Sequence, residues 1–568
     1  MTTAPQSSTI APARVPWWRE AVIYQVYLRS FSDSDGDGVG DLAGLSSRLD
    51  HLTRLGVDGL WLNPCYPSPG ADHGYDVSDY MDIDARYGGL PAFDVLLAQA
   101  HARGLRILMD LVPNHCSAEH PWFVAALGAA PGSPERERFV FRRGRGQDGG
   151  DPPNNWRSVF AGPAWTRVAG TDQWYLHSFD PSQPDFNWRN PDVVEYFETV
   201  LRFWFDRGVD GIRIDVAHML VKHADLPDWP FPVDGAADYN AYAQNQPEVH
   251  DIFRSWRRLA ESYGRDLTLV GEVWVPTVED LARYLRPDEL PQAFYFDLLM
   301  CPWDASAFRT SVARGLTEIG STGAAITWTM ANHDVHRAVT RFGLVRHSDG
   351  PGSIDPVGMA ARARGEIDVA RGERRARAAL LLLLGLPGSV YLYQGEEIGL
   401  PEVLDLPDEA RQDPIWLRSG RTEHGRDGCR VPLPWRSDGP SLGFGPAATT
   451  WLPQPSWFAP YAIEDQWDDE GSMLRLHAAA LALRKDLALR HDEAAAVGGD
   501  RLEWLDVPDR LDVLAYRRGR LTAVTVFGEE PFTPPPAWGR VILGSGPDRH
   551  AETLAGESGA WLLVDEPF

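Results

Sequence analysis

Cysteine is scarce in this chain, and the few cysteines are not arranged in pairs. Four occur in 568 residues, at Cys65, Cys116, Cys301 and Cys429, and none forms a Cys-x-x-Cys motif. This spacing argues against a zinc site of the usual pattern and against a disulfide-stapled scaffold. Unpaired thiols suit a reducing compartment, so we predict a cytoplasmic protein.

The sequence also lacks a long apolar segment. The longest uncharged run, 378–395, is broken by Gly-Leu-Pro-Gly at 385–388, so we interpret it as the end of a helix followed by a buried strand. The N-terminal stretch MTTAPQSSTIAPARVP has no apolar core, which argues against a signal peptide. Its Ser, Thr, Ala and Pro content predicts a flexible tail over residues 1–16. We therefore expect no membrane partner.

Positive charge is in short supply. Lys and Arg together number 54 against 80 Asp and Glu, which gives a formal net charge of −26. This surplus of negative charge argues against nucleic acids and anionic membranes as partners. Tryptophan, by contrast, is abundant at 22 residues. An exposed indole suits a ligand with a flat apolar face, such as a sugar.

Short apolar runs that end in polar or charged residues organise most of the chain, and they alternate with helical patterns such as 91–101 and 191–198. The eight runs are 24–31, 57–64, 106–115, 209–218, 267–274, 293–299, 325–334 and 389–397. Buried strands that alternate with helices predict an α/β fold with a parallel (β/α)8 TIM barrel, and a doubly wound sheet is the competitor. The count of eight and the chain length favour the barrel.

Two smaller domains are expected around this barrel. Residues 116–183, after the third strand, are rich in Pro, Gly and Trp, and a connection of this length needs structure of its own. We therefore predict a small inserted domain at 116–183, with the barrel formed by 17–115 and 184–489. The alternating stretches LDVLAYRRG and LTAVTVFG predict a C-terminal antiparallel β domain over 490–568.

Polar residues gather where the predicted strands end, which is the face of a TIM barrel that carries active sites. They are Asp110, Asn114 and His115 after the third strand, Arg213, Asp215 and His218 at the fourth, Glu272 at the fifth, and His333 and Asp334 at the seventh. Acidic residues from several strands suggest glycoside hydrolysis, and a structural network of ion pairs is the competing interpretation.

A retaining mechanism needs an ionised carboxylate nucleophile about 5 Å from a carboxylic acid. Arg213 and Asp215 share a face of one strand, so Arg213 should lower the pKa of Asp215. Glu272 lies in the apolar stretch LVGEVW, which favours the protonated form required of an acid.

Four motifs in order resemble the signature regions of glycoside hydrolase family 13, the α-amylase family: DLVPNH (110–115), GIRIDVAH (211–218), GEVW (271–274) and ANHD (331–334). QPDFN (183–187) resembles a fifth region, in the form found in the oligo-1,6-glucosidase and α-glucosidase branch. The resemblance implies that Asp215 is the nucleophile, Glu272 the general acid/base and Asp334 the stabiliser of the transition state. It also implies that His115, Arg213 and His333 contact the sugar.

The same resemblance implies a pocket that is closed at one end. Asp72 and Tyr75, in ADHGYDVSDY, match residues that close off the nonreducing end of the substrate in this branch. Arg426, in GRDGCRVPLPW, matches an arginine that pairs with that aspartate. A blind pocket would release one glucose at a time, whereas an open groove would give an amylase.

The stretch DSDGDGVGD (33–41) offers oxygen ligands at alternating positions, which suits a hard cation, and a solvated acidic turn is the alternative. It is not an EF-hand, because Gly44 occupies the twelfth position. The branch that the chain resembles carries a structural calcium in this loop. The resemblance therefore implies a Ca²⁺ site, with Mg²⁺ as the alternative ion. Its ligands would be Asp33, Asp35, Asp37, the Val39 carbonyl and Asp41.

Together these features predict an exo-acting retaining α-glucosidase that hydrolyses terminal nonreducing α-1,4-linked glucose from maltose and short malto-oligosaccharides, with transglucosylation as a further outcome. Oligo-1,6-glucosidase, sucrose hydrolase and α-glucosyltransferase remain alternatives on the same site, and a noncatalytic binding barrel is a remote one. In the family, Val after the nucleophile tends toward α-1,6 linkages, but Val216 is followed here by Ala217 where Ile is common. The tract LPEVLDLPDEARQDPIW resembles enzymes that act on α-1,4 linkages, and no isomerase motif of the RLDRD type is evident.

The resemblance implies that His218 supports the site, whereas a lone histidine would be structural. Trp274 is a candidate for stacking on the leaving sugar, with packing as the alternative, and either Phe160 or Phe141 is expected to line the pocket. The pair Glu396-Glu397 is interpreted as structural.

Overall fold

The computed structural model describes residues 15–230, 239–345, 354–355, 362–363, 365–487 and 502–564. The predicted tail therefore lies almost entirely outside the described residues, as do the first residues of the predicted C-terminal domain. Among the residues that the structure describes, no helix has both the length and the apolar character needed to cross a membrane.

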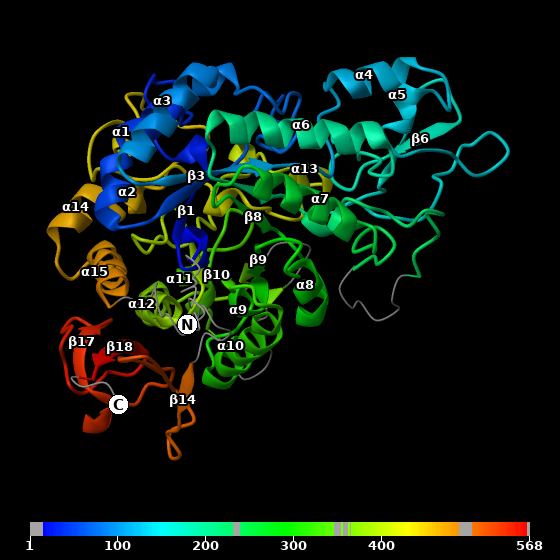
Figure 1. Cartoon of the computed structure of the whole chain (residues 1–568). Helices are drawn as coiled ribbons and strands as arrows, with labels where there is room; N and C mark the ends of the chain where they lie inside the picture. Colours follow the sequence, from blue (N-terminus) through cyan, green and yellow to red (C-terminus); the bar gives the residue numbers. More distant parts are fainter. Residues whose placement is uncertain are drawn as a thin grey trace, which may run out of the picture.

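Eight parallel strands close into a barrel at the centre of the molecule, in the order β1-β13-β10-β9-β8-β7-β3-β2 (Figure 1). They are β1 (Val22–Val26), β2 (Gly59–Leu62), β3 (Arg106–Leu111), β7 (Gly211–Ile214), β8 (Thr268–Gly271), β9 (Gln292–Tyr295), β10 (Thr327–Thr329) and β13 (Ser389–Tyr393). Each lies in or overlaps one of the eight predicted runs, so the (β/α)8 prediction is confirmed. The first predicted run begins and ends later in the chain than β1 does, because the chain forms a 3₁₀ helix at Leu28–Ser30.

Helices surround the barrel. They are α1 (Leu42–Ser47), α2 (Leu49–Leu55), α3 (Gly89–Ala102), α6 (Pro191–Arg207), α7 (Val249–Ser262), α8 (Val278–Tyr284), α9 (Phe296–Leu299), α10 (Ala305–Glu318), α11 (Ala338–Phe342), α12 (Val369–Gly385), α13 (Pro414–Arg418), α14 (Ile463–Asp468) and α15 (Met473–Asp486).

Helix α6 illustrates why such segments fold as they do. The Asn190 side chain accepts a hydrogen bond from the first turn, and Pro191 stands where no N–H is needed. Gly208, at φ 110°, ends the helix in a conformation that residues other than glycine rarely adopt.

Between β3 and α6 the chain leaves the barrel and forms α4 (Pro121–Gly128), α5 (Pro134–Glu137) and a three-stranded antiparallel sheet. The sheet has the order β4 (Phe141–Arg143), β6 (Gln173–Leu176), β5 (Trp165–Arg167). This is the small inserted domain that the long third connection predicted. The exact domain boundaries stay a prediction.

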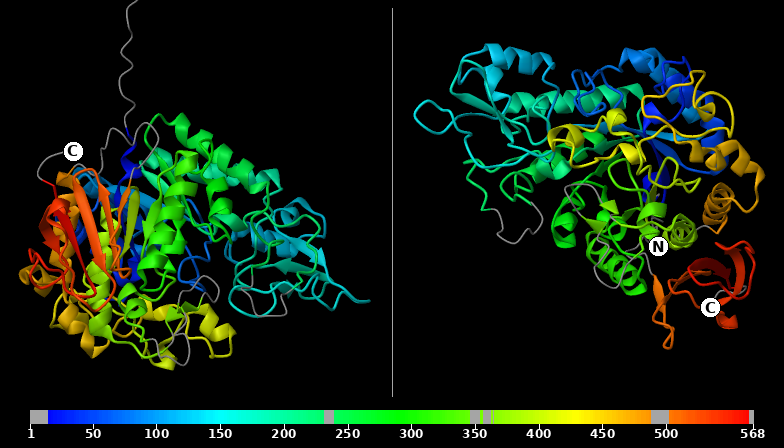
Figure 2. Two further views of the ribbon diagram at one scale, coloured as in Figure 1. Left: turned by 90° about the horizontal axis from the view of Figure 1, so that it is seen from below. Right: turned by 180° about the vertical axis from the view of Figure 1, so that it is seen from behind.

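The C-terminal segment forms a five-stranded antiparallel sheet, and the predicted β domain is thereby confirmed. Its order is β14 (Glu503–Leu505), β15 (Val513–Arg518), β16 (Leu521–Val526), β18 (Ser558–Leu563), β17 (Arg540–Gly544). The two views of Figure 2 place this sheet and the inserted domain at opposite ends of the molecule. A short pair, β11 (Ile354–Asp355) and β12 (Arg362–Ala363), lies in the connection before α12.

The C-terminal sheet is attached to helix α12 by buried polar contacts. The Trp561 indole N–H donates to the Leu381 carbonyl at 2.7 Å, and the Tyr516 hydroxyl donates to the Leu382 carbonyl at 2.6 Å. Beside them Glu557, with a side-chain exposure of 4%, accepts hydrogen bonds from arginines on α12. These arginines are Arg371, Arg374 and Arg375.

We predict that Glu557→Gln lowers the free energy of unfolding by about 2 kcal/mol at pH 7, because the arginines lose their shared carboxylate. Burial acts to raise the pKa of Glu557, but Arg371 and Arg375 outweigh it, so the pKa is lowered. The stabilisation is therefore present at neutral pH and is lost as the pH falls. Urea unfolding at pH 7 and at about pH 4 measures this difference. The exposed Glu552→Gln is the control, and an equal loss at both pH values would contradict the prediction.

Candidate active site

Arg213 stands at the centre of the barrel mouth and contacts three carboxylates. Its guanidinium donates to Asp110 at 2.7 Å, to Asp215 at 2.8 Å and to Glu272 at 2.5 Å. The three acids come from adjacent strands, since β7 pairs with β3 on one side and β8 on the other. All four side chains are almost completely buried. The structure thus brings together two of the predicted catalytic carboxylates around the predicted arginine.

Backbone hydrogen bonds fix the positions of these side chains along the barrel axis. The ladder continues one residue beyond the strands, as the Asp215 N–H donates to the Leu111 carbonyl and the Glu272 N–H donates to the Ile214 carbonyl. Asp110 is held from its other side by the Trp61 indole at 3.1 Å and the Tyr75 hydroxyl at 3.0 Å. The predicted substrate contacts are therefore anchored to the same cluster as the predicted catalytic groups.

Val216, which follows Asp215, has a strained backbone. Its φ of 35° and ψ of 48° lie in the left-handed region, which a β-branched residue rarely adopts. This conformation points the Val216 N–H toward Glu272, whose Oε2 accepts it at 3.1 Å. The strained turn thus connects the two carboxylates that a retaining mechanism needs.

A second guanidinium, that of Arg426, joins the other predicted acids. It donates to Asp72 at 2.9 Å and to Asp334 at 3.1 Å, and bonds most closely to Asp413 at 2.7 Å. The predicted pairing of Asp72 with Arg426 is present in the structure. Asp413 belongs to a tract quoted for its resemblance alone, so sequence reasoning missed its contact with Arg426.

His333 and Tyr75 lie next to this second group. Their side chains are stacked, and the Tyr75 hydroxyl lies 2.7 Å from His333 Nε2. Asp334 also accepts a hydrogen bond from Arg430 at 2.9 Å. Arg430 was likewise missed, although it lies in the stretch GRDGCRVPLPW, because the resemblance there pointed to Arg426 alone.

Arg213 lowers the pKa of Asp215, as expected, but it does not keep that pKa low. Burial raises the pKa of Asp215 well above its usual value, Arg213 opposes this, and repulsion from Glu272 and Asp110 adds to it. Burial also raises the pKa of Asp110 to about 6 against the pull of Arg213. One guanidinium can balance only one of three adjacent negative charges, so Asp215 is harder to ionise than the arginine alone would suggest.

Asp334 behaves in the opposite way. Burial acts to raise its pKa, but the neighbouring His333, Arg426 and Arg430 outweigh burial and hold the pKa at about 2. Asp72 lies between these extremes, because burial raises its pKa to about 6 although Arg426 opposes this. The site therefore contains a firmly ionised carboxylate, Asp334, beside Asp72, which takes up a proton at a higher pH.

The histidines of the site are neutral. Burial lowers the pKa of His115 to about 4, that of His218 to about 3, and that of His333 well below its usual value. They can therefore donate or accept hydrogen bonds without carrying a charge. The contact between His333 and Asp334 at 3.2 Å is accordingly not an ion pair at neutral pH.

The QPDFN stretch brings His115 next to Asp72. The Gln183 amide donates to Asp72 at 3.1 Å and lies 3.2 Å from His115 Nε2. The structure also decides between the two phenylalanines. Phe160 lies 4.9 Å under the Arg426 guanidinium, whereas Phe141 is stacked with Phe123 within the inserted domain.

The predicted metal loop follows β1. One carboxylate oxygen each from Asp33, Asp35 and Asp37 lies within 4.8 Å of the others. Burial raises the pKa of Asp37, the Val39 N–H opposes this, and repulsion from neighbouring carboxylates adds to it. A hard cation would relieve that repulsion, and oxygen donors of this kind fit Ca²⁺ or Mg²⁺.

Asp41 lies outside this group of three. Its two oxygens accept hydrogen bonds from Ser34 at 2.8 and 2.9 Å, and Oδ1 also accepts the Gly44 N–H at 2.7 Å. It thereby caps the first turn of α1. The sequence spacing alone could not distinguish a ligand from a capping residue.

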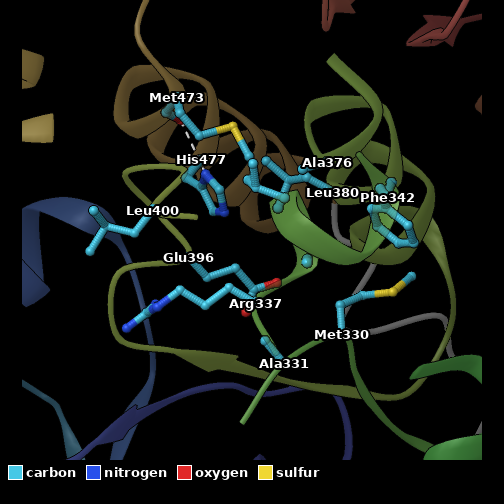
Figure 3. A pocket seen from close by; sticks show the side chains of 13 residues that line it. Met330, Ala331, Arg337, Phe342, Ala376, Leu380, Glu396, Leu400, Met473 and His477 are labelled. Atoms are coloured by element: carbon cyan, nitrogen blue, oxygen red, sulfur yellow. Dashed lines mark hydrogen bonds between the residues drawn. The ribbon is translucent and has the colours of Figure 1, made fainter. Parts of the chain in front are cut away.

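Glu396 and Glu397 take no part in the carboxylate cluster. Glu397 accepts the Tyr24 hydroxyl at 2.7 Å, and Glu396 accepts the Tyr393 N–H at 3.1 Å. Glu396 and His477 line a cavity of about 20 Å³ among α11, α12 and α15, which is room for roughly one water (Figure 3). These contacts are consistent with the structural role expected for the pair.

The barrel, its polar mouth and its sequence place the chain in a known class. The sequence model described as "Alpha amylase, catalytic domain" matches residues 25–492, and the chain belongs to the α-amylase family, glycoside hydrolase family 13. It is a glycoside hydrolase of the retaining α-glucosidase type.

Two relatives and one solved structure show how close this kinship is. The oligo-1,6-glucosidase of Parageobacillus thermoglucosidasius is 34% identical over 505 residues, which cover 83% of this chain and 84% of the relative. The probable α-glucosidase of Rhizobium meliloti (strain 1021) is 37% identical over 495 residues, 84% of each chain. The structure of an α-glucosyl transfer enzyme superimposes with a TM-score of 0.82 at 35% identity, and covers 97% of this chain and 100% of that one.

Proposed function

We propose that this protein is an exo-acting retaining α-glucosidase of the cytoplasm. It removes terminal nonreducing α-1,4-linked glucose from maltose and short malto-oligosaccharides. Transglucosylation is a second outcome of the same covalent intermediate. The joining of Asp72 and Asp413 by Arg426 supports this function best, because a wall of this kind beside Asp334 would close one end of the substrate cleft.

The reaction proceeds in two displacements. The Asp215 carboxylate attacks the anomeric carbon while Glu272 gives its proton to the departing glycosidic oxygen. A water, or the hydroxyl of an acceptor, then attacks the same carbon, loses its proton to Glu272 and frees Asp215. Asp334, ionised beside Arg426 and Arg430, supplies negative charge opposite the oxocarbenium-like transition state.

Arg213 can serve both carboxylates of this cycle, because it donates to Asp215 and to Glu272. Asp110 receives three donors, from Arg213, Trp61 and Tyr75, and so holds the guanidinium in place between them. Neutral His115 and His333, with Arg213, supply hydrogen bonds to the hydroxyls of the cleaved glucose.

The closed end fixes the exo mode of attack. Arg426 and Asp72 are both buried, so their hydrogen bonds to the nonreducing glucose would be made in a site with little water. Phe160 covers the Arg426 guanidinium from the inserted domain. A polysaccharide chain could not pass this wall, and only a chain end would reach Asp215.

An α-1,6 specificity is the second candidate, and two observations favour it. Val216 follows Asp215, and one relative reported above is named an oligo-1,6-glucosidase. The resemblance of the 400–416 tract to α-1,4-acting enzymes favours maltose in our proposal. Sucrose hydrolysis and glucosyl transfer would use the same carboxylates.

We expect Asp215→Gly to lose at least about a thousandfold in kcat, roughly 4 kcal/mol in the barrier, while the fold is retained. Azide should restore turnover by entering the space of the lost carboxylate and should give a β-linked glucosyl azide. Glu272→Gly is the matched variant, because azide then attacks the covalent intermediate and gives the α-linked product. NMR of the products reads the anomer, and α-linked azide from Asp215→Gly would disprove the assignment.

The closed pocket predicts the products. The parent enzyme should release glucose alone from maltotetraose at early times and should cleave maltose faster than isomaltose at equal concentration. Asp72→Ala should lose at least about a hundredfold in kcat/KM, near 2.7 kcal/mol, because Arg426 is left short of a partner and the glucose is misplaced. Chromatography of early products decides the mode. Maltose released without equivalent glucose, or internal cleavage of a dye-linked starch, would show an open groove.

We further propose that the loop after β1 holds one Ca²⁺, or Mg²⁺, through Asp33, Asp35, Asp37 and the Val39 carbonyl, while Asp41 closes the loop as the cap of α1. The ion would balance the loop's negative charge far along the chain from the catalytic carboxylates.

Removal of this ion should lower the melting temperature, because a ligand bound only by the folded state stabilises it. Calorimetry with and without a chelator, followed by return of Ca²⁺, measures the effect. Asp35→Asn, on the exposed part of the loop, should abolish the response. An unchanged melting temperature together with no metal on elemental analysis would leave the loop a simple acidic turn.

A further inference from the structure

A pocket of about 430 Å³ opens next to Glu272, and its described lining includes neither Asp72 nor Arg426. Its volume lies in the range of small-molecule sites. It is therefore separate from the closed end that would take the nonreducing glucose.

Trp274 forms the wall that this pocket shares with the acid/base residue. Its indole N–H donates to Glu272 Oε1 at 2.9 Å, and its ring stacks on Phe296 with centroids 3.9 Å apart. Both rings line the pocket. A leaving group that takes a proton from Glu272, or an acceptor that gives a proton to it, would thus contact an aromatic surface.

The remaining walls are mainly apolar and come from separate parts of the fold. Val159 and Leu176 belong to the inserted domain, Met219 follows β7, Val275 follows β8 and Met300 follows α9. Side chains of this kind favour apolar ligands, and the flexible thioethers can adapt to ligand shape.

Several polar side chains in the lining already have protein partners. Ser178 donates to Asp185, Thr277 donates to Asp280, and the Asn240 oxygen accepts the Tyr242 N–H. The Gln244 side chain is hydrogen-bonded to His218. A second sugar ring has several hydroxyls that need partners, and leaving them unpaired in a pocket costs affinity.

Charge in the pocket is also sparse. Arg157 is the single arginine or lysine among the described residues that line it, and Asp297 is the single carboxylate there. A phosphorylated sugar would need a stronger cluster of cations.

We propose that this pocket accepts aromatic or alkyl groups, so that the enzyme cleaves α-glucosides with apolar aglycones and transfers glucose to apolar alcohols. This inference rests on the proposed function and names the acceptor that the site prefers. In the transfer, the alcohol oxygen attacks the anomeric carbon of the Asp215 ester. Its proton passes to Glu272, the ester bond breaks, and an α-glucoside of the alcohol is formed.

Transfer from maltose to benzyl alcohol, compared with ethanol and with glucose, tests the proposal. The two alcohols offer the same primary hydroxyl and differ in the phenyl ring, so their ratio at equal concentration reports how the ring is bound. We expect benzyl alcohol to exceed both by at least about tenfold, because the ring is removed from water. Equal transfer to the two alcohols, or a preference for glucose, would overturn the proposal.

Variants locate the effect. Val275→Asn should lower the ratio of benzyl alcohol to ethanol at least about threefold by making the wall polar. If Val275→Asn folds poorly, Met300→Gln should lower the same ratio by making a different wall of the pocket polar. Val95→Asn, on the outer helix α3 with a 52% exposed side chain, is the control and should leave the ratio unchanged. A ratio that no pocket variant moves would place the alcohol elsewhere.

Direct binding separates this proposal from the proposed function. Saturation-transfer NMR of benzyl alcohol with the full chain should show contact that Val275→Asn weakens and Val95→Asn does not. This readout needs no catalysis. If no α-glucoside is cleaved, the proposed function fails while the binding result still decides the pocket. If maltose is cleaved but benzyl alcohol neither binds nor accepts glucose, only the present inference fails.

Discussion

The arrangement of the site depends on one buried guanidinium that is shared by three carboxylates. Arg213, on β7, reaches Asp215 at the end of its own strand, Asp110 on β3 and Glu272 at the end of β8. Its planar fork can meet several acceptors at fixed angles, which the single ammonium of a lysine could not. Since one positive charge cannot balance three negative ones, burial and mutual repulsion raise the pKa of Asp215 and of Asp110 despite the arginine.

The guanidinium of Arg426 has a different role in the same site. Arg426 is surrounded by Asp72, Asp334 and Asp413, but Arg430 adds positive charge, so Asp334 stays ionised. The pKa values of Asp334 and Asp215 are thus shifted in opposite directions although both residues are buried. The difference arises because Asp334 has two arginines beside it, whereas Asp215 shares one arginine with two other carboxylates.

The sequence predicted the barrel because its eight strands are short apolar runs between helices, a pattern set by burial. It also predicted Asp215, Glu272 and Arg213 as neighbours, because strand period and order bring the ends of β7 and β8 together. It gave the wrong direction for the pKa of Asp215, since the cost of burying three acids cannot be read from one flanking arginine. Asp413 and Arg430 lie in long connections without periodicity, where position is decided by the fold alone.

The closure of the barrel has a consequence for how the protein is made. Strand β1 pairs with β13, so Val22 finds its partner Val390 only after most of the chain has been synthesised. Until then the growing sheet has two open edges with unpaired backbone groups, which attract other strands. The wall of the pocket is completed later still, because Arg426 follows β13 in the chain. A ribosome-bound chain that has not reached this point carries Asp215 and Glu272 but no closed pocket. The residues that determine substrate specificity are therefore the last part of the site to be synthesised.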